Sequence, residues 1–414
     1  MPFNALKRRP LGGIRELKRF LYEAFILPCK DVPRAYLYFT SVIFAFSYSF
    51  LDLFIIIDLV KLEMSEMMSF QLTKYALISS LVIAIFLMIT RYGGKVIYPF
   101  ITAILSSAMV LTLAWPYELT PAMIGLIFAL VNAPFWALYH VFFAISVSDE
   151  NVGNEVSLAG TGLTLGVAIG TISGGIFQAL DIGFYGLVFG FGGMATGTFM
   201  LILYANKKTL RDLIISSGAL NETLPEAFRR CRYRSYGTIL DGALQTGSTL
   251  WAIFLSFSGI GAVAVGLWSG LMVFIKIVFT PIAGAMINHG HRREMMAGAI
   301  VTMTGWLPFL VTTTFALPAM YVWSVGNQLF QTGLNSAWYR SRTVASLMAR
   351  EIILMTSRLI FVPLIIWLLY TDTTYFILFM IGLSCLMIGY STYWMKSIKI
   401  KGPVMPIETL VIKR

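Results

Sequence analysis

The stretch "NKKTLRDLIISSGALNETLPEAFRRCRYR", residues 206–234, is the longest polar segment of the chain and divides it into two halves. Six apolar runs precede this stretch and six follow it. Each run is roughly twenty residues long, the length that an α-helix needs to cross the hydrocarbon core of a bilayer. The apolar residues are continuous, whereas strands of a membrane barrel would alternate in polarity. The sequence therefore predicts an all-α membrane protein with twelve transmembrane helices in two six-helix, pseudo-repeated bundles.

The composition of the whole chain supports lipid as its solvent. Of the 414 residues, 57% are hydrophobic and only 12% are charged. A soluble domain carries about 25% charged residues, so a soluble fold would have no surface for so much Leu, Ile, Phe and Met. A segment that spans the membrane must satisfy its backbone hydrogen bonds internally, so these apolar runs are expected to be helices.

The predicted organisation has five parts. They are a cytoplasmic N-terminal tail (1–34), an N-terminal bundle (35–205), a cytoplasmic central loop (206–235), a C-terminal bundle (236–396) and a cytoplasmic C-terminal tail (397–414). Within the first tail, residues 14–27 form an amphipathic pattern that is expected to lie on the inner membrane surface. The predicted spans are 35–58, 72–90, 96–114, 121–146, 156–180, 182–205, 238–257, 262–287, 295–316, 318–338, 352–370 and 374–395.

Basic residues predict the orientation, because Lys and Arg gather in cytoplasmic segments. With the N-terminus inside, 27 of the 31 Lys and Arg residues fall in the two tails, the central loop and the other predicted cytoplasmic connections. Lys61 is the clear basic residue of the outer loops. Both chain ends are therefore expected in the cytoplasm. The protein itself is expected in a bacterial inner membrane. The net charge of +11 is explained by this topology and requires no nucleic-acid partner.

Similar short patterns recur in the same order in both halves. The second predicted span ends in "FLMITRYGGKV", residues 86–96, and the eighth in "GAMINHGHRRE", residues 284–294. The fourth and tenth spans contain "FWALYH", residues 135–140, and "NSAWYR", residues 335–340. Internal duplication of this kind is common among secondary transporters.

The two turns resemble the G-x-L-x-D-R-x-G-R-K pattern of the major facilitator superfamily. The usual Asp is replaced by Thr90 in the first copy and by Asn288 in the second. The resemblance implies the major facilitator fold and a cytoplasmic gate, although an ordinary basic turn would have the same residues. Arg350 and Glu351, which are expected near the cytoplasmic mouth, are candidate gate residues as well. The full set of candidates is Arg91, Gly93, Lys95, Gly284, Asn288, Arg292, Arg293, Arg350 and Glu351.

The fifth span is rich in glycine. Its sequence "GTGLTLGVAIGTISGG", residues 160–175, resembles the span that in proton-driven exporters of the superfamily ends in G-P-x-x-G-G, with Thr171 in the place of the proline. Small residues at every fourth position let another helix approach closely, and close packing is the simpler interpretation. The predicted packing residues are Gly162, Gly166, Gly170, Gly174 and Gly175.

Two residues within spans are candidates for proton coupling. A charged side chain in the bilayer costs at least ~2.5–3.5 kcal/mol and is usually functional. Asp52 lies in the first span, where proton-coupled members of the superfamily often carry an acid, and His140 in the fourth titrates near neutrality when unperturbed. The alternatives are a structural ion pair for Asp52, for example with Lys276, and simple packing for His140.

The candidate substrate cavity is polar and basic. Lys276 and Arg358 lie deep in the eighth and eleventh spans and would favour an anion, unless Lys276 pairs with Asp52 and Arg358 with Glu351 or Asp241. The predicted cavity residues are Asn132, Trp136, Gln245, Lys276, Asn327, Gln331 and Arg358.

The resemblance and these residues together predict a secondary active transporter of a small solute that works by alternating access. Coupling to protons and an organic anion as substrate are expected. One alternative is a proton-driven efflux pump for hydrophobic compounds, and another is a receptor or assembly factor without transport. No nucleophile–base set, nucleotide loop or metal-ligand spacing points to an enzyme, a metal or another cofactor. The expected partners are the substrate, protons and the lipid bilayer, and the chain is expected to be a monomer.

Overall fold

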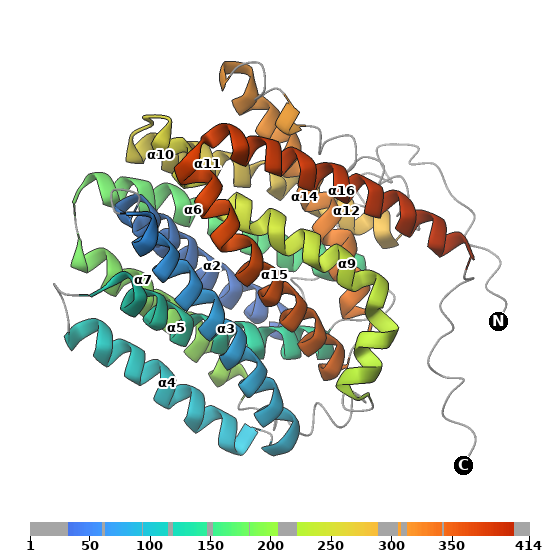
Figure 1. Cartoon of the computed structure of the whole chain (residues 1–414). Coiled ribbons are helices and arrows are strands. Elements are labelled where there is room, and N and C mark those ends of the chain that lie inside the picture. Colours follow the sequence, from blue (N-terminus) through green and yellow to red (C-terminus); the bar gives the residue numbers. More distant parts are fainter. Residues whose placement is uncertain are drawn as a thin grey trace, which may run out of the picture.

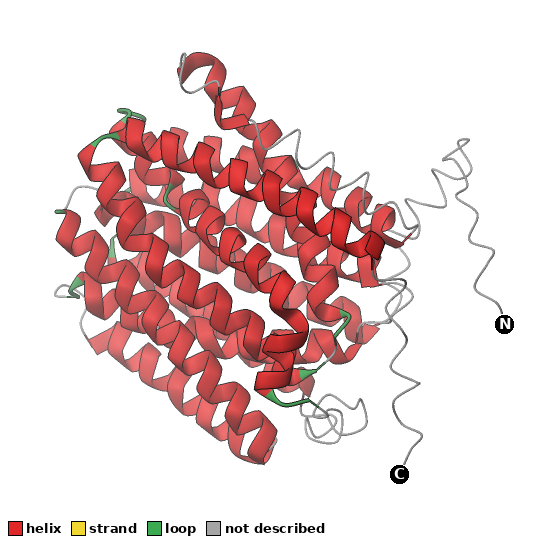
Figure 2. Ribbon diagram, turned by 45° about the vertical axis from the view of Figure 1, so that its right-hand side comes forward, coloured by secondary structure: helices red, strands yellow, loops and turns green. Residues whose placement is uncertain are grey.

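The structure of the protein is a computed structural model, and the residues that it describes form helices joined by short loops and turns (Figure 2). These residues are 32–59, 63–92, 94–114, 119–146, 152–181, 183–205, 222–288, 305–307, 313–341 and 343–400. The predicted amphipathic segment 14–27 and most of the ninth predicted span, 295–316, lie outside them. Nine helices of the described part are long and apolar enough to cross a membrane.

The N-terminal half contains six helices that correspond to the first six predicted spans. They are α2 (Val32–Leu59), α3 (Met64–Tyr92), α4 (Gly94–Ala114), α5 (Pro121–Ser146), α6 (Val152–Ala179) and α7 (Phe184–Ala205). The tight turn expected near Asp181 is present, because Asp181 and Gly183 both have a φ of +52° between α6 and α7. Asp tolerates this left-handed conformation better than most residues do.

The C-terminal half has two interrupted spans. Its helices are α9 (Leu224–Thr249), α10 (Trp251–Phe257), α11 (Ala262–Phe274), α12 (Lys276–Asn288), α14 (Thr313–Tyr339), α15 (Val344–Thr371) and α16 (Thr373–Ile400). The seventh predicted span is divided at Leu250 into α9 and α10, and the eighth is divided at Ile275 into α11 and α12.

Three helices begin eight or more residues earlier than the sequence predicted. The helix α9 begins at Leu224, so the end of the expected loop 206–235 is helical. The helices α3 and α15 begin at Met64 and Val344, eight residues before the predicted starts at positions 72 and 352. These extensions place several charged residues inside helices rather than at their ends.

Helix neighbours repeat between the two halves (Figure 1). In the N-terminal half α2 packs against α6 and α7, while α3 packs against α5. In the C-terminal half α9 packs against α15 and α16, while α12 packs against α14. The halves meet where α6 contacts α11 and α12, and where α15 contacts α3.

Glycines allow α6 to approach its neighbours closely. A Cβ added at Gly166, Gly170 or Gly174 would lie 2.1–2.6 Å from a backbone oxygen of α2. On the other side of α6, a Cβ at Gly175 would lie 2.6 Å from the Ala262 oxygen at the start of α11. The predicted stripe thus packs α6 within its own half, and Gly175 continues the packing into the other half.

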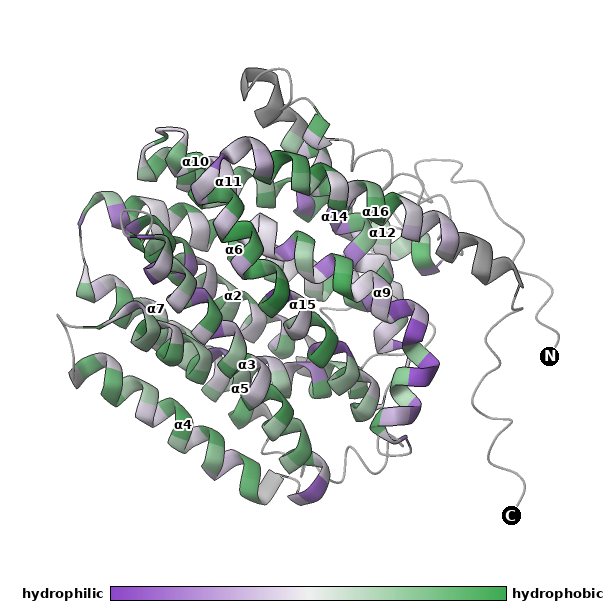
Figure 3. Ribbon diagram, in the orientation of Figure 1, coloured by the Kyte–Doolittle hydropathy of each residue, from purple (hydrophilic) through white to green (hydrophobic). Residues whose placement is uncertain are grey.

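The outward surface is largely apolar along the helices, and polar residues gather toward one end of α9 (Figure 3). Large apolar side chains such as Val110, Leu203 and Leu386 are exposed. In water this surface would be unfavourable, whereas lipid accommodates it.

Candidate functional site

A cavity of about 410 Å³ is lined by residues from both halves. Small-molecule sites commonly have a volume of about 300–1,000 Å³, so this cavity has room for a small solute. The structure places all seven predicted cavity residues and both predicted proton-coupling residues in its lining: Asn132, Trp136, Gln245, Lys276, Asn327, Gln331, Arg358, Asp52 and His140. Whether they bind a substrate or a proton remains a prediction.

Asp52 has a cationic partner on the neighbouring helix α3. The Lys74 ammonium lies 2.8 Å from the Asp52 carboxylate, and the Lys74 side chain is 0% exposed. The same ammonium lies 4.8–5.0 Å from the ring centroids of Phe70, Tyr75 and Phe128. The ion pair suggested between Asp52 and Lys276 is therefore not formed.

Arg358 binds an amide rather than a carboxylate. Its guanidinium donates to Gln245 Oε1 and lies 5.4 Å from the centre of the Tyr75 ring. Gln245 Nε2 in turn donates to Asp241 at 2.8 Å. Gln331 Nε2 donates to the other Asp241 oxygen at 3.0 Å. The direct pairs suggested from the sequence, Arg358 with Glu351 or Asp241, are replaced by this amide-bridged network.

Lys276 is the cation of the cavity without a direct partner. It begins α12 directly after the interruption at Ile275. Within the described part of the chain, its ammonium makes no hydrogen bond and no ion pair within 4 Å, and Asp241 interacts with it only at longer range. Lys276 and Arg358 thus present positive charge that no carboxylate contacts directly.

His140 belongs to a buried cluster that joins the two halves. From α5, its Nδ1 lies 2.5 Å from the Tyr339 hydroxyl and its Nε2 lies 3.2 Å from Glu351 Oε1. Arg350 pairs with Glu351 and donates to Asn335 Oδ1 at 2.9 Å. Tyr339 and Asn335 are on α14, while Arg350 and Glu351 are on α15. These five residues, which we call the bridging cluster, can hold α5 against α14 and α15.

Several polar groups of the cavity have no hydrogen-bond partner in the part of the chain that the structure describes. They are Asn132 Nδ2, Asn327 Oδ1, Ser269 Oγ and Arg358 Nε. Asn132 is 2% exposed and Asn327 1% exposed. A buried polar atom without a partner costs about 1–3 kcal/mol. A polar solute with both donors and acceptors would meet this need.

Asn288, which replaces the acid of the superfamily motif, contacts the start of a helix in the other half. Its Oδ1 accepts from the Gly153 backbone N–H at 2.8 Å, in the first turn of α6. Gly284 lies in the same crossing, since a Cβ there would be 2.5 Å from the Gly153 oxygen. A neutral amide therefore supplies a hydrogen-bond acceptor at the position where the superfamily motif usually has a carboxylate.

The other predicted gate residues that the structure describes lie away from that crossing. Arg91 is exposed at the end of α3, and Arg350 and Glu351 lie in the bridging cluster. Gly93, Arg292 and Arg293 lie outside the described residues, as does the side chain of Lys95. The gate remains a prediction at every one of these positions.

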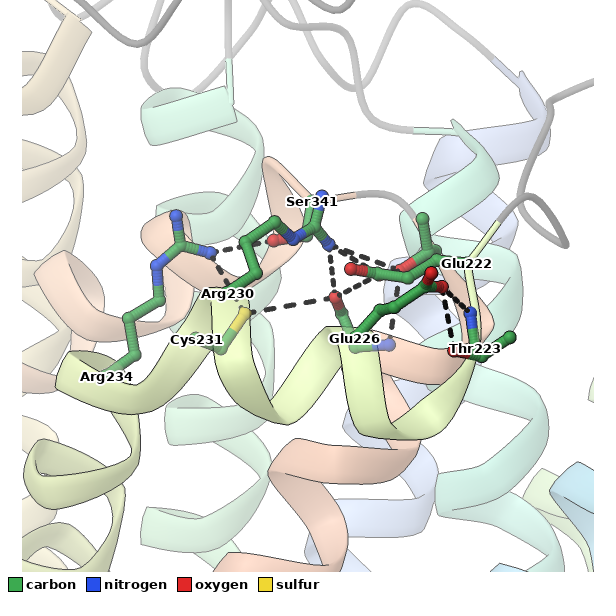
Figure 4. Close-up of polar contacts among 9 residues, drawn as sticks. Glu222, Thr223, Glu226, Arg230, Cys231, Arg234 and Ser341 are labelled. Carbon is green, nitrogen blue, oxygen red and sulfur yellow. Dashed lines mark hydrogen bonds and ion pairs between the residues drawn. The ribbon is translucent and has the colours of Figure 1, made fainter.

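A second polar cluster joins the first turns of α9 and α15 (Figure 4). The Glu222 carboxylate lies 2.6 Å from Arg230, 2.5 Å from the Thr343 hydroxyl and 3.0 Å from the Ser346 hydroxyl. The neighbouring Glu226 accepts from the Thr223 backbone N–H at 2.9 Å, and this bond lowers the pKa of its carboxyl. This cluster lies within one half, so it fixes two of that half's helices together.

Sequence reasoning did not select three residues that the structure makes important. Lys74 and Tyr339 were placed near span ends, and Asp241 was considered only as a possible partner of Arg358. Their signal in the sequence was a charged or phenolic group within an apolar run. For Lys74 and Asp241 it was hidden because the predicted helix starts were several residues late, and Tyr339 fell just beyond a predicted span end.

Neither a family model nor a curated protein sequence matches the chain. Solved structures do. The human organic anion transporter MFSD10 (TETRAN) is 11% identical with a TM-score of 0.64, over 86% of this chain and 98% of that one. A bacterial homologue of the iron transporter ferroportin, in an outward-facing state with soaked iron, is 14% identical with a TM-score of 0.63, over 87% and 98% of the two chains.

A variant of the E. coli fucose:proton symporter FucP is 14% identical with a TM-score of 0.62, over 88% of this chain and 98% of that one. At this level of sequence identity the structural similarity indicates a shared fold. The similarity extends over nearly the whole of each solved chain. The nine apolar helices of the described part agree with it. The chain is therefore a multi-pass integral membrane protein with the twelve-helix major facilitator fold that its sequence predicted.

Proposed function

We propose that this protein is a secondary active transporter that moves a small organic anion across the membrane by alternating access. In this mechanism the two halves rock about a central site, which is open to one side of the membrane at a time. The observation that carries the proposal is the unpaired Lys276 ammonium, which lines the same cavity as Arg358. The likeness to transporters with the same fold supports transport but not the choice of solute.

The charges around the cavity support an anion. Asp52 is neutralised by Lys74 and Glu351 by Arg350. Among the described residues Lys276 has no direct partner, and Arg358 is bonded to a neutral amide. Arg presents a planar fork that fits a carboxylate, and Lys adds a compact charge. An entering anion therefore gains two cations without breaking an ion pair.

Two other functions predict a different cavity. A pump for hydrophobic compounds should have an aromatic cavity with Lys276 and Arg358 paired, whereas here Lys276 is unpaired within the described part of the chain. A receptor without transport should have its cavity filled by side chains, whereas about 410 Å³ is open. Both observations favour the transporter.

We also propose that transport is coupled to protons. Of the two groups predicted from the sequence, His140 is the better placed, because it lies between Glu351 and Tyr339 in the bridging cluster. Protonating Asp52 would leave the buried Lys74 without a counter-charge, which is costly. Substitution of each residue separately, with substrate-driven proton movement as the readout, distinguishes the two.

The anion preference is tested with purified protein and matched solutes. Binding of gluconate, lactate and succinate is measured by calorimetry beside neutral glucose and cationic glucosamine. We expect at least one carboxylate to bind and the neutral and cationic sugars not to bind. Lys276→Gln and Arg358→Gln should each weaken the binding at least about tenfold, as expected for the loss of a charged hydrogen bond. Tighter binding of glucose than of all three acids would contradict the proposal.

A further inference from the structure

Asp241 is a buried carboxylate that has no role in the function proposed so far. It lies in α9 and is 2% exposed. Its two oxygens accept hydrogen bonds from Gln245 Nε2 at 2.8 Å and from Gln331 Nε2 at 3.0 Å. Within the described residues, no cation lies within 4 Å of it. Its immediate partners are thus two neutral amides.

The other two carboxylates of this region are held differently. Asp52 is paired with Lys74, and Glu351 is paired with Arg350. A buried carboxylate is costly when no cation touches it, and gaining a proton removes that cost. Asp241 is therefore the carboxylate of these three that can take a proton without stranding a contacting cation.

The charged groups that face Asp241 lie one layer away. Arg350 and Arg358 on α15 and Lys276 on α12 interact with it electrostatically, but Arg350 is already engaged by Glu351. The helices α10 and α14 and the part of α16 up to Met395 contain no charged residue. The ionised form of Asp241 is thus stabilised by its two amide hydrogen bonds and, at longer range, by Arg350, Arg358 and Lys276. Of these three cations, Lys276 and Arg358 are the two that an anion in the cavity would engage.

Gln245 connects Asp241 to the cavity. Its Nε2 donates to Asp241 Oδ2, and its Oε1 accepts from Arg358. An amide has one accepting and one donating end, whereas a guanidinium can only donate. If Asp241 Oδ2 gains a proton, its O–H becomes a donor, and Gln245 must turn its oxygen toward it. The amide nitrogen then faces Arg358, so the hydrogen bond between Gln245 and Arg358 is lost.

We propose that Asp241, rather than His140 or Asp52, binds the coupled proton, and that its protonation, transmitted through Gln245, frees Arg358 for the anion, so that one proton and one anion bind together. This inference rests on the anion transport proposed above. The proton goes to Asp241 Oδ2, the anion takes the guanidinium that Gln245 gives up, and no net charge is added to the site. By linkage, the anion raises proton affinity as much as the proton raises anion affinity.

The test measures carboxylate affinity from pH 6.5 to pH 8.5, with the acid among gluconate, lactate and succinate that the wild type binds best. One linked proton should weaken binding by about tenfold per pH unit on the alkaline side. Asp241→Asn resembles the protonated acid in shape and in its donor, so its affinity should stay near the wild-type value at low pH and should not change with pH. Asp58→Asn, an exposed acid outside the cavity, should keep the wild-type slope.

Two further measurements keep the inference falsifiable. The double variant Asp52→Asn with Lys74→Gln removes another carboxylate of this region together with its cationic partner. It should keep the wild-type dependence of carboxylate affinity on pH. If Asp241→Asn does not fold, wild-type calorimetry in two buffers of different ionisation enthalpy should show uptake of about one proton per anion.

A pH slope that persists in Asp241→Asn, or no proton uptake by the wild type, would overturn the role of Asp241 while leaving anion transport intact. If none of the three acids binds, the proposed function fails and this inference fails with it.

Discussion

The Lys74 ammonium of α3 lies 2.8 Å from the Asp52 carboxylate of α2, and the buried ammonium is surrounded by aromatic rings. The ammonium can donate three hydrogen bonds, and the three rings around it offer their negative faces. Asp52 thus compensates the charge of a cation that is buried inside the N-terminal half. This relationship links the first two spans and gives Asp52 a structural task.

Asp52→Asn should therefore destabilise the fold. Loss of one partner of a buried pair costs about 3–5 kcal/mol, because the other charge is left uncompensated. The melting temperature in detergent should fall clearly for Asp52→Asn and less for the double variant with Lys74→Gln. An unchanged melting temperature in the single variant would show that the pair is not needed for stability.

The bridging cluster should favour the conformation seen here. Tyr339→Phe removes the hydroxyl that contacts His140, and His140→Gln also removes the contact with Glu351. Each lost hydrogen bond should lower the free energy needed to separate the two halves at this end by about 0.5–1.5 kcal/mol. Both variants should therefore increase the population of the separated conformation. Spin labels at the exposed positions Tyr92 and Tyr236, in protein without native cysteines, would report this as a longer distance in the distribution.

Tyr321→Phe offers a control for that experiment. Its ring also lies on α14, but no hydrogen bond of its hydroxyl is found in the described part of the chain. The distance distribution of this variant should match the wild type. A longer distance in the control, or an unchanged one in both cluster variants, would contradict the bridging role.

Gly153→Ala should disturb the crossing of α6 and α12. A Cβ there would lie 2.4 Å from the Gly284 oxygen and 2.5 Å from Asn288 Oδ1, so the two helices must separate. Overpacking of this kind costs about 1–3 kcal/mol. We expect a lower melting temperature and slower transport. Gly192→Ala is the matched control, because nothing lies within 4 Å of a Cβ there. Equal effects at the two positions would show that the crossing is not the cause.

Much of this fold could be predicted because lipid imposes long apolar helices. The six N-terminal spans, the turn at Asp181 and the glycine packing of α6 all follow from that constraint. The cavity residues could be predicted for a related reason, since a polar or charged group within an apolar run must face the protein interior or water. Asn132, Gln245, Lys276 and Arg358 meet in one cavity accordingly.

Pairings between helices could not be predicted, because hydropathy marks only the part of a helix that lies in lipid. The helix α3 extends eight residues before its predicted start, so Lys74 lies three turns inside it and reaches Asp52. Likewise α15 begins at Val344, so Glu351 lies two turns inside the helix and is buried, rather than lying at the cytoplasmic mouth of the cavity. The partners of Arg358 depended on the relative rotation of α9 and α15, which sequence spacing does not fix.

The most direct test of the central claim is uptake by proteoliposomes of labelled gluconate, lactate or succinate, with labelled glucose as the neutral reference. We predict that an inwardly directed proton gradient drives accumulation of at least one of the acids, that wild-type protein leaves glucose outside, and that Lys276→Gln abolishes accumulation. Uptake of glucose in preference to all three acids, or acid uptake that is unchanged in Lys276→Gln, would contradict the account.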